Sequence, residues 1–343
     1  MNYILAIDQG GSHTRAAVSD IKGNILSYHC VNGACHSIDG LELSMQMIRK
    51  ASEFVIKKAG LKLSNIDLIY SGMTGADFQY EYDLLHESIA NLNICPNIVV
   101  NNDSIIALRG GTLNAYGAIV NAGTGVNCAI ISPFGEEFIY QYYAQDDIQG
   151  GSALSKKILN TIYNAETFRI PPTNLTELVL KHLGFIDVDS LLMADVENKI
   201  SRIQRLSIVP LVFDAANRGD KASITLIKQM AKAFAGLVQG GVRKFRMEEV
   251  AFEVVISGGI FKGKGSILID TFTDEVKLVA PNASIVNAIY EPIIGAVLLG
   301  IEHIGFEINN EILQNIDNSA KNFGLTRNKN LENPKLNLFK QQI

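Results

Sequence analysis

The stretch that decides the fold of this chain is Ala6-Ile7-Asp8-Gln9-Gly10-Gly11-Ser12-His13-Thr14. It separates two short apolar runs, residues 3–7 and 14–18, and two such runs around a glycine-rich turn predict a β-hairpin. A similar turn, Asn121-Ala122-Gly123-Thr124-Gly125, separates two further apolar runs at 117–121 and 126–131. A pattern that restarts in this way predicts two similar domains with a cleft between them.

The rest of the chain is expected to add alternating strands and helices to both halves. Further strands are predicted at residues 25–31, 66–70, 98–100, around 138–142, and at 254–256. Helical spacing of apolar residues predicts helices at residues 41–59, 153–164, 189–217, 220–245 and 291–304. The expected domains are an N-terminal domain at 1–117, a C-terminal domain at 118–305, and a polar extension at 306–343, part of which is expected to be disordered.

The composition excludes several classes of protein. The chain has 343 residues and a net charge of −5 without a stripe of basic residues, so no nucleic-acid partner is expected. The longest apolar run near the end, residues 293–301, is too short to cross a bilayer, and the N-terminus is expected to be a strand and not a signal peptide. The four cysteines form no CxxC pair, which favours reduced thiols and a cytoplasmic location.

The two glycine turns are candidate anion-binding sites. Glycines let backbone N–H groups approach an anion closely, and nearby hydroxyl groups add donors. An aspartate at the end of the first strand, Asp8, would then lie beside bound phosphates and hold a hydrated Mg²⁺. The alternative for the first turn is an ordinary polar hairpin. The candidate phosphate contacts are Gly10, Gly11, Ser12, Thr14, Gly123, Thr124 and Gly125.

Two further motifs follow predicted strands. Gly258 and Gly259 would let a purine or ribose rest against the backbone, although a glycine turn between a strand and a helix is common. Asp103 precedes a helix and is a candidate general base, with helix capping as the favoured alternative on local grounds. Neither GxGxxG nor GxxxxGK[ST] occurs, so the Rossmann and P-loop classes lack their required residues, and no His, Asp and Glu cluster has metal-ligand spacing.

Taken in order, these motifs resemble the sugar-kinase/actin/heat-shock-chaperone superfamily. Within it the chain is most similar to the N-acetylglucosamine kinase family, which is related to the ATPase subunits of benzoyl-CoA reductase. The resemblance covers residues 1–305 and includes the segment 208–222 and Pro292 with Gly295 and Ala296. It implies an α/β chain with two actin-like (ribonuclease H-like) domains and an interdomain nucleotide cleft.

The activity implied is that of a phosphotransferase with an alcohol acceptor. Such a sugar kinase transfers the γ-phosphate of Mg-ATP to a hydroxyl of a small sugar, here an amino sugar or related polyol. The alternative is an ATPase that couples nucleotide-driven domain closure to a protein partner, as the reductase activators do. The four cysteines do not match the placement of the cluster ligands in those activators, and Cys128 lies within a predicted strand. A third reading is a nucleotide-binding protein that has lost catalysis, and the retention of Asp8 and Asp103 weakens it.

The resemblance also assigns roles to individual residues. Asp103 becomes the base that takes the proton of the acceptor hydroxyl, and Asp8 holds the water shell of Mg²⁺. Gly258 and Gly259 pack on the adenosine, and a homodimer is the suggested assembly. The expected contacts to the sugar are His36, Asn102, Gln149, Gly151 and Ser152, with a surface-loop histidine as the alternative for His36.

The sugar side of the resemblance is altered in this chain. Gln149 and Gly150 stand where the family carries acidic residues, and Tyr143 stands where it often has Trp. This predicts that N-acetylglucosamine is a poor acceptor, unless Asp146 or Asp147 replaces the missing carboxylate.

Overall fold

The computed structural model describes residues 2–112, 114–144 and 148–327, which fold as two compact units. The first unit combines the residues up to Gly117 with those from Val286 onward. The second unit is Ala118–Ile285. Asp146 and Asp147, the predicted replacements for the missing carboxylate, lie outside the described residues.

The first unit is built on a five-stranded sheet with the order β3-β2-β1-β4-β5. The predicted hairpin is present, because β1 pairs antiparallel with β2 and places Asp8 opposite Arg15. The strand β3 extends the sheet antiparallel to β2, whereas β4 and β5 join on the other side in parallel. The strands are β1 (Tyr3–Gln9), β2 (His13–Asp20), β3 (Ile25–Asn32), β4 (Ile66–Met73) and β5 (Ile98–Asn102).

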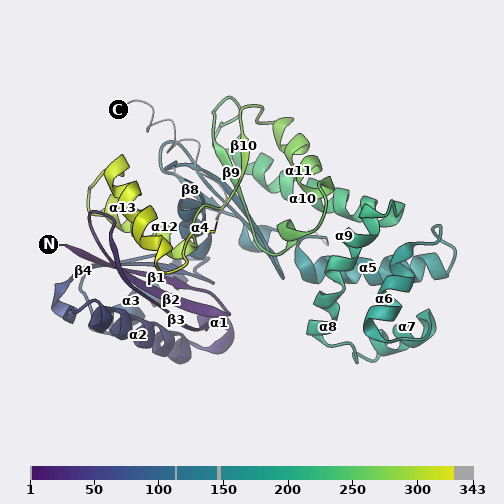
Figure 1. The fold of residues 1–343 in the computed structure, drawn as a ribbon, viewed down its shortest axis with the longest axis horizontal. Coiled ribbons are helices and arrows are strands. Elements are labelled where there is room, and N and C mark those ends of the chain that lie inside the picture. Colours follow the sequence, from purple (N-terminus) through teal and green to yellow (C-terminus); the bar gives the residue numbers. More distant parts are fainter. Residues whose placement is uncertain (1, 113, 145–147, 328–343) are drawn as a thin grey trace. The chain divides into compact units, whose positions relative to one another are not determined.

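Helices cover both faces of this sheet (Figure 1). One face packs on α2 and α3, the other on α4, α12 and α13, and alternate residues of β1 enter the two resulting cores. The helices are α1 (His36–Asp39), α2 (Leu41–Lys58), α3 (Gln79–Ala90), α4 (Asp103–Gly111), α12 (Pro292–His303) and α13 (Asn310–Lys321).

The placement of α12 differs from the predicted C-terminal domain at 118–305. This helix is apolar on nearly every side, and Ile293, Val297 and Ile301 are fully buried in the core of the first unit. The following helix, α13, buries Ile312 and Ile316 in the same core, so this part of the expected extension at 306–343 is ordered structure. The order of elements along the chain does not show which of the two sheets the last helices pack on. The predicted boundary of the C-terminal domain was wrong for that reason.

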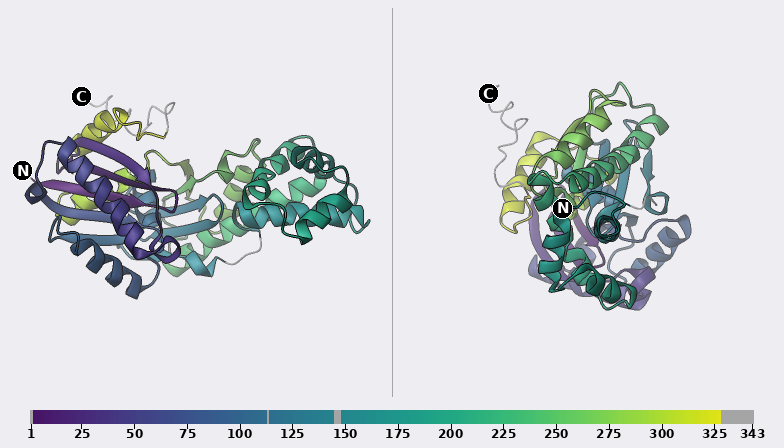
Figure 2. Two further views of the ribbon diagram at one scale, coloured as in Figure 1. Left: turned by 90° about the horizontal axis from the view of Figure 1, so that it is seen from below. Right: turned by 90° about the vertical axis from the view of Figure 1, so that its right-hand side faces the viewer.

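The second unit has its own five-stranded sheet, with the order β10-β9-β6-β7-β8. The turn at Gly123–Gly125 joins β6 to β7, and most of the helices between β8 and α10 gather at one end of the unit (Figure 2). The strands are β6 (Gly117–Ala122), β7 (Val126–Ile131), β8 (Glu137–Ile139), β9 (Glu253–Ser257) and β10 (Ser284–Asn287). The helices are α5 (Gly150–Glu166), α6 (Asn174–Leu183), α7 (Val188–Val196), α8 (Arg202–Ser207), α9 (Val209–Asn217), α10 (Lys221–Lys244) and α11 (Ile267–Lys277).

The predicted single helix at 189–217 is wrong, because this segment forms α7, α8 and α9. Asn198 has a positive φ of 56°, which a helix interior does not allow. Ser201 then caps a new helix by accepting a hydrogen bond from the backbone N–H of Gln204. Pro210 lies in the first turn of α9, where its missing N–H costs no helical hydrogen bond.

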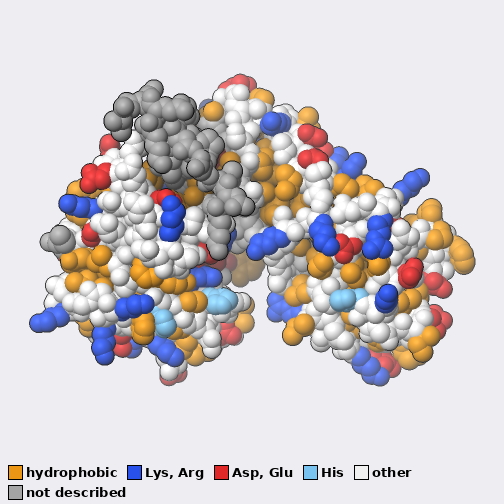
Figure 3. Space-filling view, in the orientation of Figure 1, with side chains coloured by type: hydrophobic (Ala, Val, Ile, Leu, Met, Phe, Trp, Pro, Cys, Tyr) orange, Lys and Arg blue, Asp and Glu red, His pale blue; other side chains and the backbone are white. Residues whose placement is uncertain are grey.

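Charged side chains of both signs are interspersed over the face shown in Figure 3. Among the described residues, no helix is both long and apolar enough to cross a membrane.

Gly295 provides a test of the packing between α4 and α12. A Cβ at this position would lie 1.8 Å from the carbonyl oxygen of Ile106 and 2.6 Å from the amide nitrogen of Gly110. Because both are backbone atoms, Gly295→Ala should lower the free energy of unfolding by about 3 kcal/mol in denaturant titration.

The matched control is Gly236→Ala in α10, where an added Cβ meets no atom within 4 Å. This variant should raise the free energy of unfolding by about 0.5–1 kcal/mol, because alanine is the better helix former. Equal stability of the two variants would contradict the close approach of α4 and α12.

Candidate functional site

Asp8 lies at the carboxyl end of β1, beside the first glycine turn. It is 4% exposed, and its Oδ2 accepts a hydrogen bond from Nη1 of Arg15 at 2.9 Å. Burial raises the pKa of Asp8, and the charge of Arg15 partly offsets that rise. The charge of Arg15 on the neighbouring strand therefore favours the ionised form of this buried carboxyl group.

Asp103 begins α4 at the end of β5, at the same edge of the sheet. The residue keeps some accessible surface, but the protein around its carboxyl group displaces water. This desolvation, together with the negative charge of Asp8, raises the pKa of Asp103 to about 7, while a hydrogen bond from Thr74 opposes the rise. A carboxyl group with this pKa can accept or release a proton at neutral pH.

Helix capping does not explain Asp103, because the N-cap of α4 is Asn102. The side-chain oxygen of Asn102 accepts a hydrogen bond from the backbone N–H of Ser104 at 2.8 Å. Its Nδ2 donates to the backbone oxygen of Ala76 and to Oδ1 of Asp77. Asn102 is 1% exposed, and its carboxamide holds the loop after β4 against α4. The predicted contact of Asn102 to a sugar remains a prediction.

The first glycine turn contains both open and buried members of the predicted phosphate site. Gly11 and Ser12 are exposed, and a Cβ at Gly11 would meet no atom within 4 Å. Thr14, in contrast, is fully buried, and its hydroxyl accepts a hydrogen bond from Gln9 at 3.3 Å. The contact of the Thr14 hydroxyl to a phosphate remains a prediction, because this hydroxyl already accepts a hydrogen bond within the protein.

His36 is the first residue of α1 and is buried, which contradicts the alternative of a surface-loop histidine. Neither ring nitrogen has a hydrogen-bond partner among the described residues, and Nε2 lies 3.8 Å from Oε1 of Glu81. Glu81 is 5% exposed and accepts hydrogen bonds from the backbone N–H groups of Asp77 and Phe78. The predicted contact between His36 and a sugar remains a prediction, because it requires a ligand atom to reach this ring.

The second glycine turn, Gly123–Gly125, is braced by the first turn of α5. The backbone N–H of Gly151 donates to the carbonyl oxygen of Gly123, and that of Ser152 donates to Thr124, both at 2.8 Å. These amide groups of the two predicted sugar contacts are therefore used within the protein. Gln149 is the N-cap residue of α5; it is 6% exposed, and its Nε2 donates to the carbonyl oxygen of Ala233.

The glycines of the second unit fall into two groups. A Cβ at Gly123, Gly125 or Gly259 would meet no protein atom within 4 Å, so the fold itself does not exclude a side chain there. Gly258 is different, because it has a φ of +99° and a Cβ would lie 2.2 Å from the carbonyl oxygen of Ala122. Gly150 is also required by the backbone, with a φ of +81° and a Cβ 2.6 Å from Gly125.

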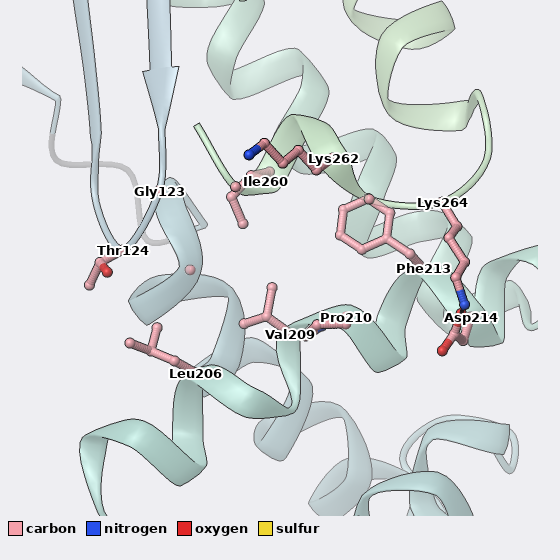
Figure 4. A pocket seen from close by; sticks show the side chains of 13 residues that line it. Gly123, Thr124, Leu206, Val209, Pro210, Phe213, Asp214, Ile260, Lys262 and Lys264 are labelled. Atoms are coloured by element: carbon pink, nitrogen blue, oxygen red, sulfur yellow. Dashed lines mark hydrogen bonds and ion pairs between the residues drawn. The ribbon is translucent and has the colours of Figure 1, made fainter. Parts of the chain in front are cut away.

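A cavity of about 540 Å³ opens beside the turn in the second unit (Figure 4). Gly123 and Thr124 lie at one end, and the ion pair between Asp214 and Lys264 lies at the other, with Nζ to Oδ1 at 3.1 Å. The walls between these ends are largely apolar and come from α8, α9 and the 3₁₀ turn Ile260–Lys262. They include Leu206, Val209, Pro210, Phe213 and Ile260.

Sequence reasoning missed several of these residues. Arg15 was identifiable, because a hairpin that pairs Gln9 with Thr14 necessarily places Arg15 opposite Asp8. The apolar walls of the cavity carried no such signal, since Phe213 and its neighbours have the composition of ordinary helix cores. Among the described residues, no group of three or more His, Cys, Asp or Glu side chains is placed to hold a metal ion directly.

Residues 5–162 match the model of the BadF/BadG/BcrA/BcrD ATPase family. The matched part covers somewhat less than half of the chain. It contains Asp8, Asp103 and both glycine turns.

Similar proteins extend the match over most of the chain. The N-acetyl-D-glucosamine kinase of Dictyostelium discoideum is 28% identical over 316 residues, which cover 87% of this chain and 97% of that protein. The N-acetylmuramic acid/N-acetylglucosamine kinase of Clostridium acetobutylicum is 23% identical and covers 87% of this chain and 98% of its own length. These relatives confirm the predicted resemblance to the N-acetylglucosamine kinase family.

The solved structures bear on the fold. A Chromobacterium violaceum protein assigned as an N-acetylglucosamine kinase superposes with a TM-score of 0.62 at 20% identity, covering 87% of this chain and 98% of that structure. With the two five-stranded sheets, this similarity confirms the predicted α/β fold of two actin-like domains.

The pKa of Asp103 can be tested without a substrate. Carbon-detected NMR of ¹³C-labelled aspartate should show one carboxyl group titrating at about 7, and Asp103→Asn should remove that signal. Asp8→Asn should lower the pKa of Asp103, because it removes a neighbouring negative charge and leaves the charge of Arg15 uncompensated.

Asp83→Asn on the exposed side of α3 is the control and should leave this titration unchanged. A pKa for Asp103 in the ordinary range of carboxyl groups would contradict the electrostatic account.

Proposed function

We propose that this protein is an ATP-dependent kinase that phosphorylates a hydroxyl of a small amino sugar or related polyol. The observation that carries the proposal is the pair of carboxyl groups at one edge of the first sheet. Asp8 is ionised beside a glycine turn, and Asp103 has a pKa of about 7. The relatives named above are kinases of N-acetylglucosamine and N-acetylmuramic acid, which supports an acceptor of this class.

The cavity of the second unit fits a nucleoside. Its apolar walls suit a flat purine, and its open end at Gly123 and Thr124 would receive the phosphate chain. Gly259 adds an open surface against which a sugar ring or base can rest without steric conflict. The glycines whose side-chain space is empty are then the ones that the nucleotide approaches most closely.

Asp8 fits a role as the carboxylate that holds Mg²⁺ through water. A magnesium ion retains several waters and needs only one or two carboxylates in a nucleotide site, so a larger cluster of acidic residues is not required. When bound, Mg²⁺ would neutralise charge on the phosphate chain. Arg15 would keep Asp8 ionised and oriented until then.

Asp103 would act as the general base of phosphoryl transfer. It takes the proton from the acceptor hydroxyl, the hydroxyl oxygen forms a bond to the γ-phosphorus, and the bond to the β–γ bridging oxygen breaks to release ADP. Asn102 positions this base by capping α4 from the preceding residue. The base belongs to the first unit, and the nucleoside cavity belongs to the second.

The family match gives a specific reason to keep a second candidate function. The matching model describes ATPases, so nucleotide hydrolysis coupled to a protein partner is the alternative. ATP turnover that proceeds equally fast with and without every sugar tested would favour it. A strict requirement for an acceptor would favour the kinase.

The base is tested by Asp103→Asn, which preserves size but removes basicity. Sugar-dependent turnover should fall about 100-fold or more, because the acceptor proton has no base to receive it. The affinity for Mg-ADP, measured by calorimetry on the same sample, should change little. Near-full activity in this variant would exclude Asp103 as the base.

The nucleoside cavity is tested by Gly259→Leu. The new side chain meets no protein atom at its Cβ and enters the space assigned to the nucleoside, so the affinity for ADP should fall about tenfold or more while the protein stays folded. Gly236→Leu in α10 is the matched control, since its Cβ is equally unobstructed but lies outside the cavity. Equal ADP affinity in the two variants would show that the nucleoside binds elsewhere.

A further inference from the structure

A second cavity of about 500 Å³ lies against the same glycine turn of the second unit. Thr124 lines both cavities, whereas Gly123 lines only the nucleoside cavity and Gly125 lines only the second one. The turn thus forms a shared wall, with the proposed donor on one side and space for another molecule on the other. The other residues of the second cavity include Gln149, Ser152, Lys156 and Arg202.

The charge of this second cavity is one-sided. Of the described side chains that line it, the charged ones are Lys156 and Arg202, and both are basic. Neither forms an ion pair with another described residue, whereas nearby Arg205 is paired with Asp195 and Lys199 with Glu197. The hydroxyl groups of Thr124 and Ser152 add neutral donors to the same lining.

Gln149 and the residue after it add no negative charge to the cavity. Gln149 lines the cavity with a neutral carboxamide. A charged side chain could not replace Gly150 without strain, because the backbone there has a φ of +81° and approaches Gly125. The described lining therefore presents two cations and no carboxylate.

We propose that this second cavity binds a negatively charged substituent, a carboxylate, of the acceptor sugar. The inference rests on the proposed kinase function and narrows its acceptor to a sugar acid. Lys156 and Arg202 supply charge-assisted hydrogen bonds to the carboxylate, and Thr124 places it beside the phosphates of the donor. Because both cations are exposed, the preference for an acidic acceptor weakens as salt concentration rises.

The same chemistry could serve the phosphate chain of the nucleotide. Both sources are anions, so the cavity alone does not separate them. They differ in what the basic residues affect: a carboxylate site changes only the binding of acidic sugars, whereas a phosphate site changes the affinity for Mg-ATP in the absence of any sugar.

The experiment compares N-acetylmuramate with N-acetylglucosamine, which lacks the carboxylate. Both sugars are assayed in kinetics and titrated calorimetrically into the Mg-ADP complex of the wild type and of the double variant Lys156→Gln, Arg202→Gln. Lys228→Gln on the exposed side of α10 controls for the loss of positive charge. The wild type should prefer N-acetylmuramate, and the double variant should lose about tenfold or more in affinity for it while its binding of N-acetylglucosamine stays unchanged.

Three results would overturn the inference. They are equal or better binding of N-acetylglucosamine by the wild type, equal losses for both sugars, or a lower affinity for Mg-ATP without sugar in the double variant. The calorimetric arm also separates this inference from the proposed function. Specific binding of N-acetylmuramate without turnover would support the carboxylate site and contradict the proposed kinase function. Turnover of N-acetylglucosamine alone would support the kinase function and contradict the carboxylate site.

Discussion

Two carboxyl groups, Asp8 and Asp103, share one edge of the first sheet in surroundings where water is scarce. Burial raises the cost of ionising both groups, and the negative charge of Asp8 raises it further for Asp103. Asp8 faces Arg15 across the hairpin, and that charge favours its anionic form. Asp103 receives hydrogen bonds from the neutral groups of Thr74 and Ser104 and has a pKa of about 7. Asp8 is thereby suited to interact with a cation, and Asp103 is suited to accept a proton.

The close approach of α4 and α12 supports this arrangement. The catalytic candidate Asp103 begins α4, and Gly110 and Gly295 allow that helix to lie directly against α12. Farther along, Arg109 is 2% exposed and forms an ion pair with Glu302 of α12, with Nη2 to Oε1 at 2.8 Å. Packing of this density leaves the base little freedom to move, as positioning of a general base requires.

The sequence was most informative where structure is local. The hairpin of β1 and β2 could be predicted because its turn residues and its strands are adjacent, and the same adjacency fixes the pairing of Asp8 with Arg15. The sheet joined by α12 could not be predicted, because that contact links residues far apart in the chain. Thr14 and Asn102 were assigned to ligands on residue type, which does not reveal that both are buried and form hydrogen bonds within the protein. The glycines of the second unit also look alike in the sequence but differ in the structure. The fold leaves room for a side chain at Gly123 and Gly259, whereas the backbone at Gly258 requires glycine.

In a sugar kinase the γ-phosphate passes to a sugar hydroxyl and not to water. ³¹P NMR of the purified protein with Mg-ATP, recorded with and without an amino-sugar acceptor, distinguishes the two fates. With the acceptor present, a sugar-phosphate resonance should grow in equal amount with ADP, and little inorganic phosphate should form in either sample. Inorganic phosphate released at the same rate with and without sugar, and no sugar phosphate, would contradict the proposed kinase function.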